Sequence, residues 1–124
     1  MTNHVPWCMV DTNTAFQFLE SMGRALHEPG VANCPSCERG ELRFYFHWFA
    51  RAERRGSLWV WCPACREWTH SRIRVEFEYD DVFAGLSLAE FAALERKDWL
   101  GTLDRMWTAS EIPHSVRWPS GDCA

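Results

Sequence analysis

Four of the six cysteines form two C-x-x-C pairs, Cys34-Pro-Ser-Cys37 and Cys62-Pro-Ala-Cys65. A C-x-x-C turn directs both of its sulfurs the same way, so two such turns supply the four corners of a tetrahedron. Two other interpretations are a thioredoxin-like redox motif and a pair of disulfides. Redox proteins usually carry a single C-x-x-C, and disulfides are disfavoured in a chain without a secretion signal. The cysteines therefore predict one structural Zn²⁺ ion.

No arrangement of residues that is typical of a catalytic site accompanies these cysteines. The five histidines form no H-x-x-x-H or H-E-x-x-H pair, and the chain has no P-loop and no G-x-S-x-G turn. A zinc deaminase would need an H-x-E segment before a P-C-x-x-C, and neither pair has one. His70 is a candidate general base or a histidine on the surface of a strand, and the second interpretation is favoured. A zinc ion with four cysteine ligands has no open position for water, so we expect no enzymatic activity.

The composition is that of one globular domain. The chain has 124 residues, 47% of them hydrophobic, and a formal net charge of −4. No apolar run approaches the roughly 20 residues that span a bilayer, and the first residues do not resemble a secretory signal. We therefore expect a cytoplasmic protein with no membrane segment.

The spacing of apolar residues predicts the elements that position the cysteines. Helices are expected at 14–27, with a capping box formed by Thr14 and Gln17, and at 87–107, with a capping box formed by Ser87 and Glu90. The second apolar stripe falters around Glu95–Asp98, so two shorter helices are an alternative there. Alternating patterns predict strands at 41–49, 57–61 and 67–80, with a hairpin turn at 51–56.

We call each C-x-x-C turn a knuckle. The order knuckle, strand, hairpin, strand, knuckle, strand resembles the zinc ribbon over residues 34–79. The expected fold class is α+β, with a three-stranded antiparallel zinc-ribbon sheet packed against an N-terminal and a C-terminal helix. Residues 1–124 would form a single domain. Its parts would be an N-terminal helical segment (1–33), the zinc ribbon (34–80), and a C-terminal helix and tail (81–124).

Four further residues near the cysteine motifs or chain ends carry smaller expectations. Arg39 and Arg66 follow the two knuckles closely and could offset the negative charge of four thiolates bound to one zinc ion. Cys8 lies in an apolar stretch and is expected to be buried. Cys123 lies next to the last residue, and a redox pair with Cys8 is a minor alternative.

Basic residues at the hairpin and on the third strand are a candidate nucleic-acid surface. Arginines interleaved with aromatic residues can bind a nucleic-acid strand, although an acidic chain must gather its cations on one patch. A solvated hairpin is the simpler interpretation. The arginines concerned are Arg51, Arg54, Arg55, Arg72 and Arg74.

Acidic residues after the second knuckle are a candidate surface for a protein partner. Carboxylates in a row on one strand face could bind a basic surface, and two tryptophans of the preceding strand could form an exposed ledge beside them. An exposed polar strand face is the alternative. The residues concerned are Glu76, Glu78, Asp80, Asp81, Trp59 and Trp61.

The chain as a whole resembles the small bacterial immunity proteins of polymorphic toxin systems. The likeness rests on its size, its acidic charge, the missing secretion signal and catalytic motif, and its eight tryptophans. It implies a cognate toxin as partner, bound tightly and through complementary charge. A nucleic-acid-binding zinc ribbon that assists transcription or translation is the alternative function.

Overall fold

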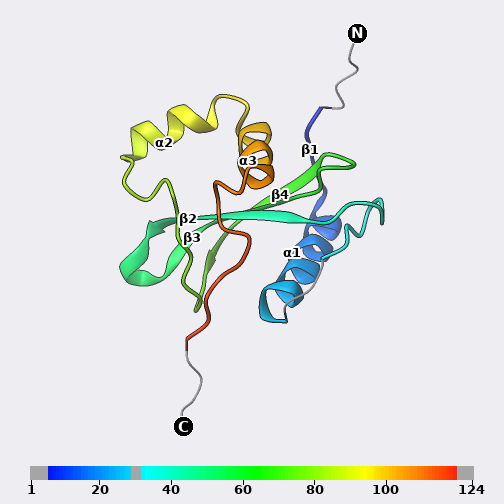
Figure 1. The fold of residues 1–124 in the computed structure, drawn as a ribbon, viewed down its shortest axis with the longest axis horizontal. Coiled ribbons are helices and arrows are strands. Elements are labelled where there is room, and N and C mark those ends of the chain that lie inside the picture. Colours follow the sequence, from blue (N-terminus) through cyan, green and yellow to red (C-terminus); the bar gives the residue numbers. More distant parts are fainter. Residues whose placement is uncertain (1–5, 29–31, 120–124) are drawn as a thin grey trace. The chain divides into compact units, whose positions relative to one another are not determined.

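The computed structural model describes residues 6–28 and 32–119. Over these residues the fold is α+β, with three α-helices and one four-stranded sheet (Figure 1). The chain divides into two compact units. Unit 1 comprises Met1–Phe44 and Trp59–His70, and unit 2 comprises Tyr45–Leu58 and Ser71–Ala124. The two C-x-x-C pairs both belong to unit 1.

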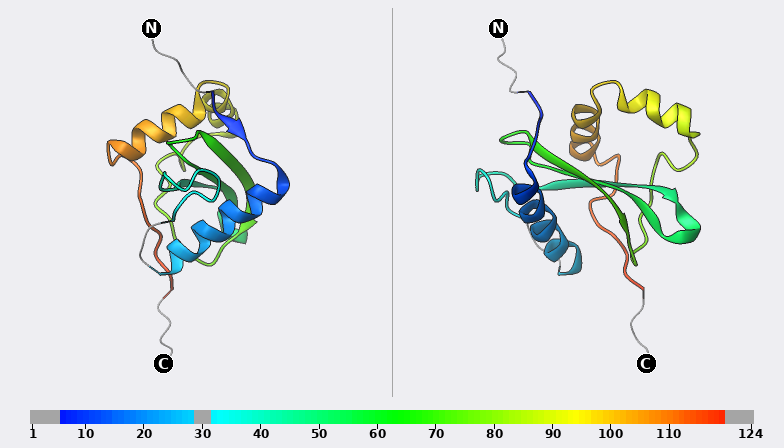
Figure 2. Two further views of the ribbon diagram at one scale, coloured as in Figure 1. Left: turned by 90° about the vertical axis from the view of Figure 1, so that its right-hand side faces the viewer. Right: turned by 180° about the vertical axis from the view of Figure 1, so that it is seen from behind.

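The sheet has the strand order β1-β4-β3-β2. Its strands are β1 (Cys8–Met9), β2 (Arg43–Ala50), β3 (Arg55–Trp61) and β4 (Glu67–Arg74). The expectation of a three-stranded antiparallel sheet is wrong in one respect, because β1 adds a fourth strand and pairs parallel with β4 (Figure 2). Cys8 lies opposite Glu67 in this pair and Met9 lies opposite Trp68. The β1 segment has only two residues, which is too short to show an alternating pattern, so it could not be predicted as a strand.

Strand β4 ends at Arg74, six residues before the end of the predicted strand. The Val75 amide still donates to Arg54 O (2.8 Å). After this bond, the Arg54 side chain replaces a neighbouring strand as the hydrogen-bond donor. Its guanidinium donates to Val75 O (2.8 Å) and Phe77 O (2.6 Å). Carbonyls that bind a side chain are satisfied without a strand ladder, so the alternating pattern continues here without forming a strand.

Helix α1 (Thr12–His27) begins two residues earlier than predicted. Its N-cap is Asp11, whose carboxylate accepts a hydrogen bond from the Thr14 amide (2.8 Å), so the predicted Thr14–Gln17 capping box is wrong. The helix buries Phe18 and Met22 in unit 1. None of the helices in the described part of the chain has the length and apolarity needed to cross a bilayer.

Two helices occupy the predicted 87–107 segment, α2 (Leu88–Glu95) and α3 (Trp99–Thr108). The break lies where the apolar stripe falters. The Ser87–Glu90 capping box is confirmed, with Glu90 N donating to Ser87 Oγ (3.1 Å) and Ser87 N donating to Glu90 Oε1 (2.8 Å). Asp98 is the N-cap of α3 and accepts from the Gly101 amide (3.2 Å).

Aromatic rings form most of the core of unit 2. One cluster joins β2 to α2 and α3, and its closest packing is the His47 imidazole stacked on Phe91 at 3.8 Å. The other members of that cluster are Tyr45, Phe83 and Trp99. Tyr45 also contacts Tyr79, with ring centroids 5.4 Å apart, and so joins this cluster to further rings. These are Phe46, Trp48, Phe77 and, at the surface, Trp118.

Candidate metal centre

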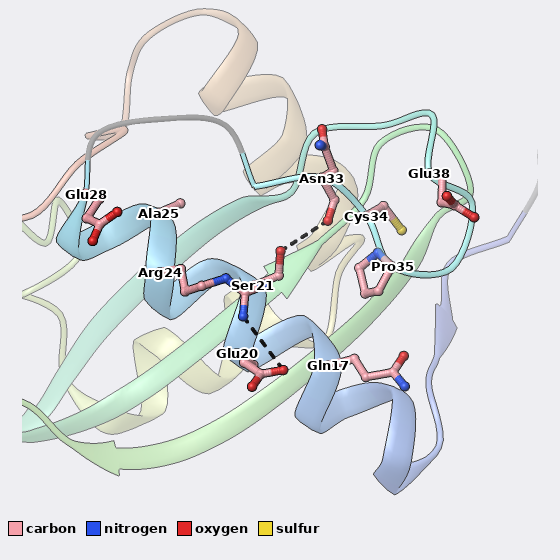
Figure 3. A pocket seen from close by; sticks show the side chains of 10 residues that line it. All are labelled: Gln17, Glu20, Ser21, Arg24, Ala25, Glu28, Asn33, Cys34, Pro35 and Glu38. Carbon is pink, nitrogen blue, oxygen red and sulfur yellow. Dashed lines mark hydrogen bonds and ion pairs between the residues drawn. The ribbon is translucent and has the colours of Figure 1, made fainter.

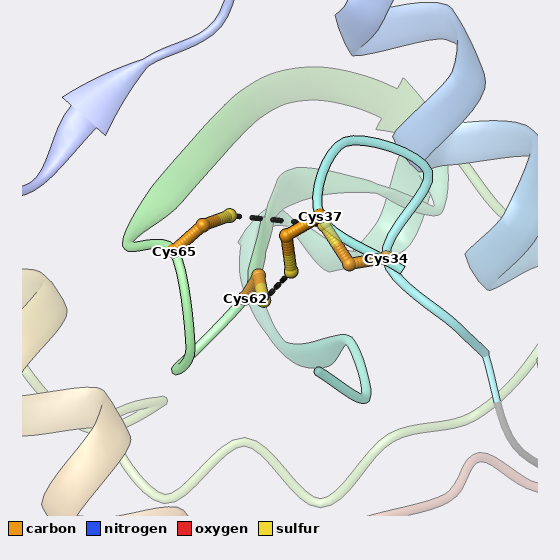
Figure 4. Close-up of side chains that lie close together, drawn as sticks. All are labelled: Cys34, Cys37, Cys62 and Cys65. Atoms are coloured by element: carbon orange, nitrogen blue, oxygen red, sulfur yellow. Dashed lines mark hydrogen bonds between the residues drawn. The ribbon is translucent and has the colours of Figure 1, made fainter. Parts of the chain in front are cut away.

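The two cysteine pairs form loops of the same backbone design in unit 1 (Figure 4). In the first loop, Glu38 N donates to Cys34 O (2.9 Å), and in the second, Arg66 N donates to Cys62 O (2.9 Å). Glu38 and Arg66 are both in the left-handed region, with φ of 56° and 61°. The Cys34 amide also donates to Gly40 O (2.8 Å), which returns the chain toward β2. The two loops are thus equivalent halves of one site.

The four sulfurs have the spacing of a tetrahedral metal site. All four lie within 4.8 Å of one another. Across the two loops, Cys34 Sγ lies 3.8 Å from Cys65 Sγ, and Cys37 Sγ lies 3.7 Å from Cys62 Sγ. A tetrahedron with metal–sulfur distances of about 2.3 Å has edges of about 3.8 Å. The geometry of this donor set therefore fits one metal ion.

The protein environment shifts the thiol pKa values of Cys37, Cys62 and Cys65 in different directions. Burial tends to raise the pKa of Cys37, but hydrogen bonds from the backbone at Arg39 and Gly40 outweigh it and lower the pKa to about 6. Burial raises the pKa of Cys62 and of Cys65. Backbone N–H groups aimed at sulfur stabilise a thiolate, the form in which cysteine binds metal.

That Arg39 and Arg66 offset the charge of the four thiolates stays a prediction. Arg66 lies over the ring of Trp7, 4.7 Å from its centroid, and Arg39 is exposed. Arg39 acts through its backbone, as described above. The next residue, Gly40, also belongs to the site, although it was not identified as a site residue from the sequence. A Cβ built on Gly40 would overlap Cys62 Sγ and lie 3.0 Å from the Ala64 Cβ.

An open groove of about 670 Å³ lies beside the first cysteine loop, between that loop and α1 (Figure 3). Its wall is polar, with Ser21 Oγ donating to Asn33 O (3.2 Å). The charged residues that line it are Glu20, Arg24, Glu28 and Glu38. An open groove of this kind resembles a surface furrow more than an enclosed substrate cavity.

The acidic residues after β4 do not form a free row of carboxylates. Glu76 pairs with Arg74 (2.5 Å). Asp80 receives two hydrogen bonds from the Arg117 guanidinium (2.8 and 3.1 Å), which lowers the pKa of Asp80. Arginines of the same unit thus neutralise much of the charge that was expected to bind a partner.

Glu78 is engaged by two arginines of the hairpin. Arg51 Nη2 lies 2.6 Å from Glu78 Oε1, and Arg54 Nη1 lies 2.9 Å from Glu78 Oε2. Both guanidinium groups also lie over the Trp48 ring, 4.9 and 5.5 Å from its centroid. The hairpin is therefore held to the segment after β4, and these two arginines of the candidate nucleic-acid surface are neutralised.

Asp81 is a core residue, contrary to the expectation of a surface carboxylate. Its side chain is fully buried and lies 2.7 Å from His47 Nδ1. It accepts hydrogen bonds from the Tyr45 hydroxyl and from the amides of Trp48 (2.9 Å) and Phe83 (3.0 Å). Burial tends to raise the pKa of Asp81, but the contacts with His47 and Tyr45 outweigh it, so the pKa lies below its usual value. No pattern in the sequence indicated this cluster.

The expected tryptophan ledge is absent. Trp59 is 2% exposed and Trp61 is fully buried, and their strand neighbours Leu58 and Val60 are buried as well. Both faces of β3 are covered at these positions, so alternation along the strand does not separate an exposed face from a buried one. His70, expected on the surface of a strand, lies on β4, is half-buried and stacks on Trp59 at 4.7 Å.

The two cysteines outside the cluster differ from the expectations for them. Cys8 is exposed, so the prediction that it is buried is wrong. Its strand lies at one edge of the sheet, where the side chain is not covered. Cys123 lies outside the described residues.

Comparison of the chain with protein-family models, with curated proteins and with solved structures gave no match.

Proposed function

We propose that this chain is a non-catalytic, zinc-stabilised binding protein that acts by holding a protein partner. An immunity protein that neutralises a cognate bacterial toxin is the class we favour. The zinc-stabilised part of this proposal is supported by one observation. The four thiols of Cys34, Cys37, Cys62 and Cys65 have tetrahedral spacing. Zinc is the metal that most often takes four cysteine ligands in a structural site.

The role of the ion is to hold the fold together. Four cysteine ligands complete the coordination shell, so no position is left for a water molecule or a substrate. The ion joins two loops from distant parts of the sequence, and its binding free energy contributes directly to folding. A reducing compartment such as the cytoplasm keeps four thiols available for this purpose.

A protein partner is favoured over nucleic acid because three of the five candidate arginines are already paired with carboxylates. Arg51 and Arg54 pair with Glu78, and Arg74 pairs with Glu76. Non-specific nucleic-acid binding depends on several cations that are free to contact phosphates. Exposed apolar side chains of unit 2 also suit a protein interface, among them Phe49 (39% exposed) and Leu88 (81% exposed).

The experiment that tests this function is toxin neutralisation. The protein encoded by the neighbouring gene would be expressed in bacteria with and without this chain. We expect growth arrest without the chain, rescue with it, and co-purification of the two proteins in a stable complex. Failure to rescue, together with salt-sensitive retention of the purified chain on RNA or DNA, would favour the nucleic-acid-binding zinc ribbon instead.

A further inference from the structure

An exposed aromatic ring and three exposed arginines lie together on one face of the sheet in unit 2. They are Phe49 on β2, Arg55 on β3, and Arg72 and Arg74 on β4, and we call them the arginine face. The Arg72 guanidinium lies over the Phe49 ring, 5.4 Å from its centroid. This contact places β4 and β2 side chains on the same side of the sheet.

The alternation of side chains places Arg55 on that side as well. A Cβ built on Gly56 would overlap the Phe46 ring, so Gly56 and Phe46 point to one face. Neighbouring positions on a strand point to opposite faces, so Arg55 and Phe49 share the other. Arg74 lies two positions after Arg72 and therefore points the same way.

The inner part of this face is covered and the outer part is not. His47, two residues before Phe49, is buried beneath Phe91 of α2. Phe49 is 39% exposed, and the three arginines are exposed. The covering helices of unit 2 thus leave the arginine face open.

Two cations of the arginine face have no carboxylate partner among residues 6–28 and 32–119. Arg55 makes no ion pair there, and Arg72 contacts the Phe49 ring instead of an acid. The other arginines around the hairpin pair with carboxylates, as described above. Positive charge beside an exposed ring is the composition of protein-binding hot spots, where arginine and aromatic residues are enriched.

We infer that the arginine face is the docking surface for an acidic, partly apolar segment of a protein partner. This inference rests on the proposed function. It assigns partner binding to the basic arginine face instead of the acidic segment after β4. Arg55 and Arg72 would each accept a carboxylate in a bidentate pair. Phe49, with the methylene groups of Arg72, would cover the apolar part of the segment.

The same geometry argues against a nucleic-acid strand on this face. Base stacking needs an open ring face, and the Arg72 guanidinium already lies over Phe49. Two free arginines neutralise few phosphates, while the chain as a whole carries a net charge of −4. A short acidic protein segment needs only a few charge pairs in addition to its apolar contact.

The test is a titration of the zinc-loaded, full-length protein with a labelled peptide of alternating glutamate and leucine. A thymidine oligonucleotide of equal charge is the second probe. Binding would be followed by fluorescence anisotropy and by backbone amide shifts in NMR spectra. We expect salt-sensitive binding of the peptide, with the largest shifts at residues 49, 55 and 72.

The variant Arg55→Glu with Arg72→Glu should weaken peptide binding at least tenfold and keep its zinc. The matched control is Arg24→Glu with Arg105→Glu, which makes the same change in net charge at two exposed arginines elsewhere (70% and 69% exposed). The control should bind within about twofold of the unmodified chain. Equal weakening in both variants would overturn the inference, because net charge alone would explain it.

Three further results would also overturn the inference. The first is that the peptide does not bind. The second is that the oligonucleotide binds more tightly than the peptide, and that the Arg55→Glu, Arg72→Glu variant loses this oligonucleotide binding. The third is full toxin neutralisation by that variant, which would leave the proposed function intact. If the peptide binds at the arginine face but no toxin is neutralised, the inference holds and the proposed function fails.

Discussion

Gly40 is the residue on which the packing of the two cysteine loops depends most closely. It follows the first loop, is buried, and approaches Cys62 of the second loop so closely that a side chain would overlap the sulfur. Its φ is not positive, so the need for glycine comes from space and not from backbone conformation. The four cysteines could be predicted from their spacing, but this glycine could not, because its neighbour is 22 positions away in the sequence.

Substitution Gly40→Ala should therefore impair the metal centre. The added methyl group would push Cys62 Sγ away from its tetrahedral position, so we expect zinc affinity to fall at least tenfold in a competition titration with a chromophoric chelator. Gly23→Ala is the matched control, since nothing lies within 4 Å of a Cβ there. That control should keep full zinc affinity and gain up to about 1 kcal/mol in unfolding free energy from helix propensity. Unchanged affinity in Gly40→Ala would show that the loops do not pack as described.

Among the elements, the helices were predicted better than the third long strand. The Ser87–Glu90 capping box and the break near Asp98 depend on residues within one turn of the chain, so the sequence indicates them directly. The end of β4 depends instead on Arg54, which reaches the carbonyls of Val75 and Phe77. A side chain from the hairpin turn ends the ladder, and alternation within residues 67–80 contains no sign of it.

Arg54 should accordingly matter more for stability than its neighbour Arg51. Arg54→Met removes hydrogen bonds to two carbonyls and one carboxylate, so we expect a loss of roughly 2 kcal/mol in unfolding free energy. Arg51→Met removes an ion pair that is largely exposed (61% and 37%), and should cost less than about 1 kcal/mol. Urea denaturation of the zinc-loaded proteins measures both, and equal losses would contradict the role of Arg54.

For the whole molecule, the buried Asp81 carboxylate links stability to pH. Its folded-state pKa lies below the ordinary value of 3.8, so the stability it contributes is present above that value and is lost as pH falls through the folded pKa. The side chains that contact this carboxylate are the His47 imidazole and the Tyr45 hydroxyl. Burial and the Asp81 charge raise the pKa of Tyr45, so its hydroxyl keeps its proton and remains a hydrogen-bond donor. The cluster joins two separate segments of unit 2, residues 45–48 and 81–83, which is why no local pattern predicted it.

The variant Asp81→Asn should separate this contribution from the rest of acid denaturation. We expect it to lose about 1–3 kcal/mol in unfolding free energy near pH 7, where the charged acceptor is missing. The difference from the unmodified chain should shrink as the pH is lowered below the ordinary value of 3.8. Chemical denaturation at a series of pH values tests this, and a difference that stays constant down to pH 2 would contradict the placement of Asp81.

The metal content of the purified protein decides whether a zinc ion holds the two cysteine loops together. Native mass spectrometry of protein prepared without chelators should show one zinc ion per chain. Removal of that ion, or the substitution Cys62→Ser, should abolish the near-ultraviolet circular dichroism of the tryptophans, because folding is coupled to metal binding. A metal-free chain with an unchanged spectrum, and a Cys62→Ser variant that folds as well as the original, would show that no metal ion holds this fold together.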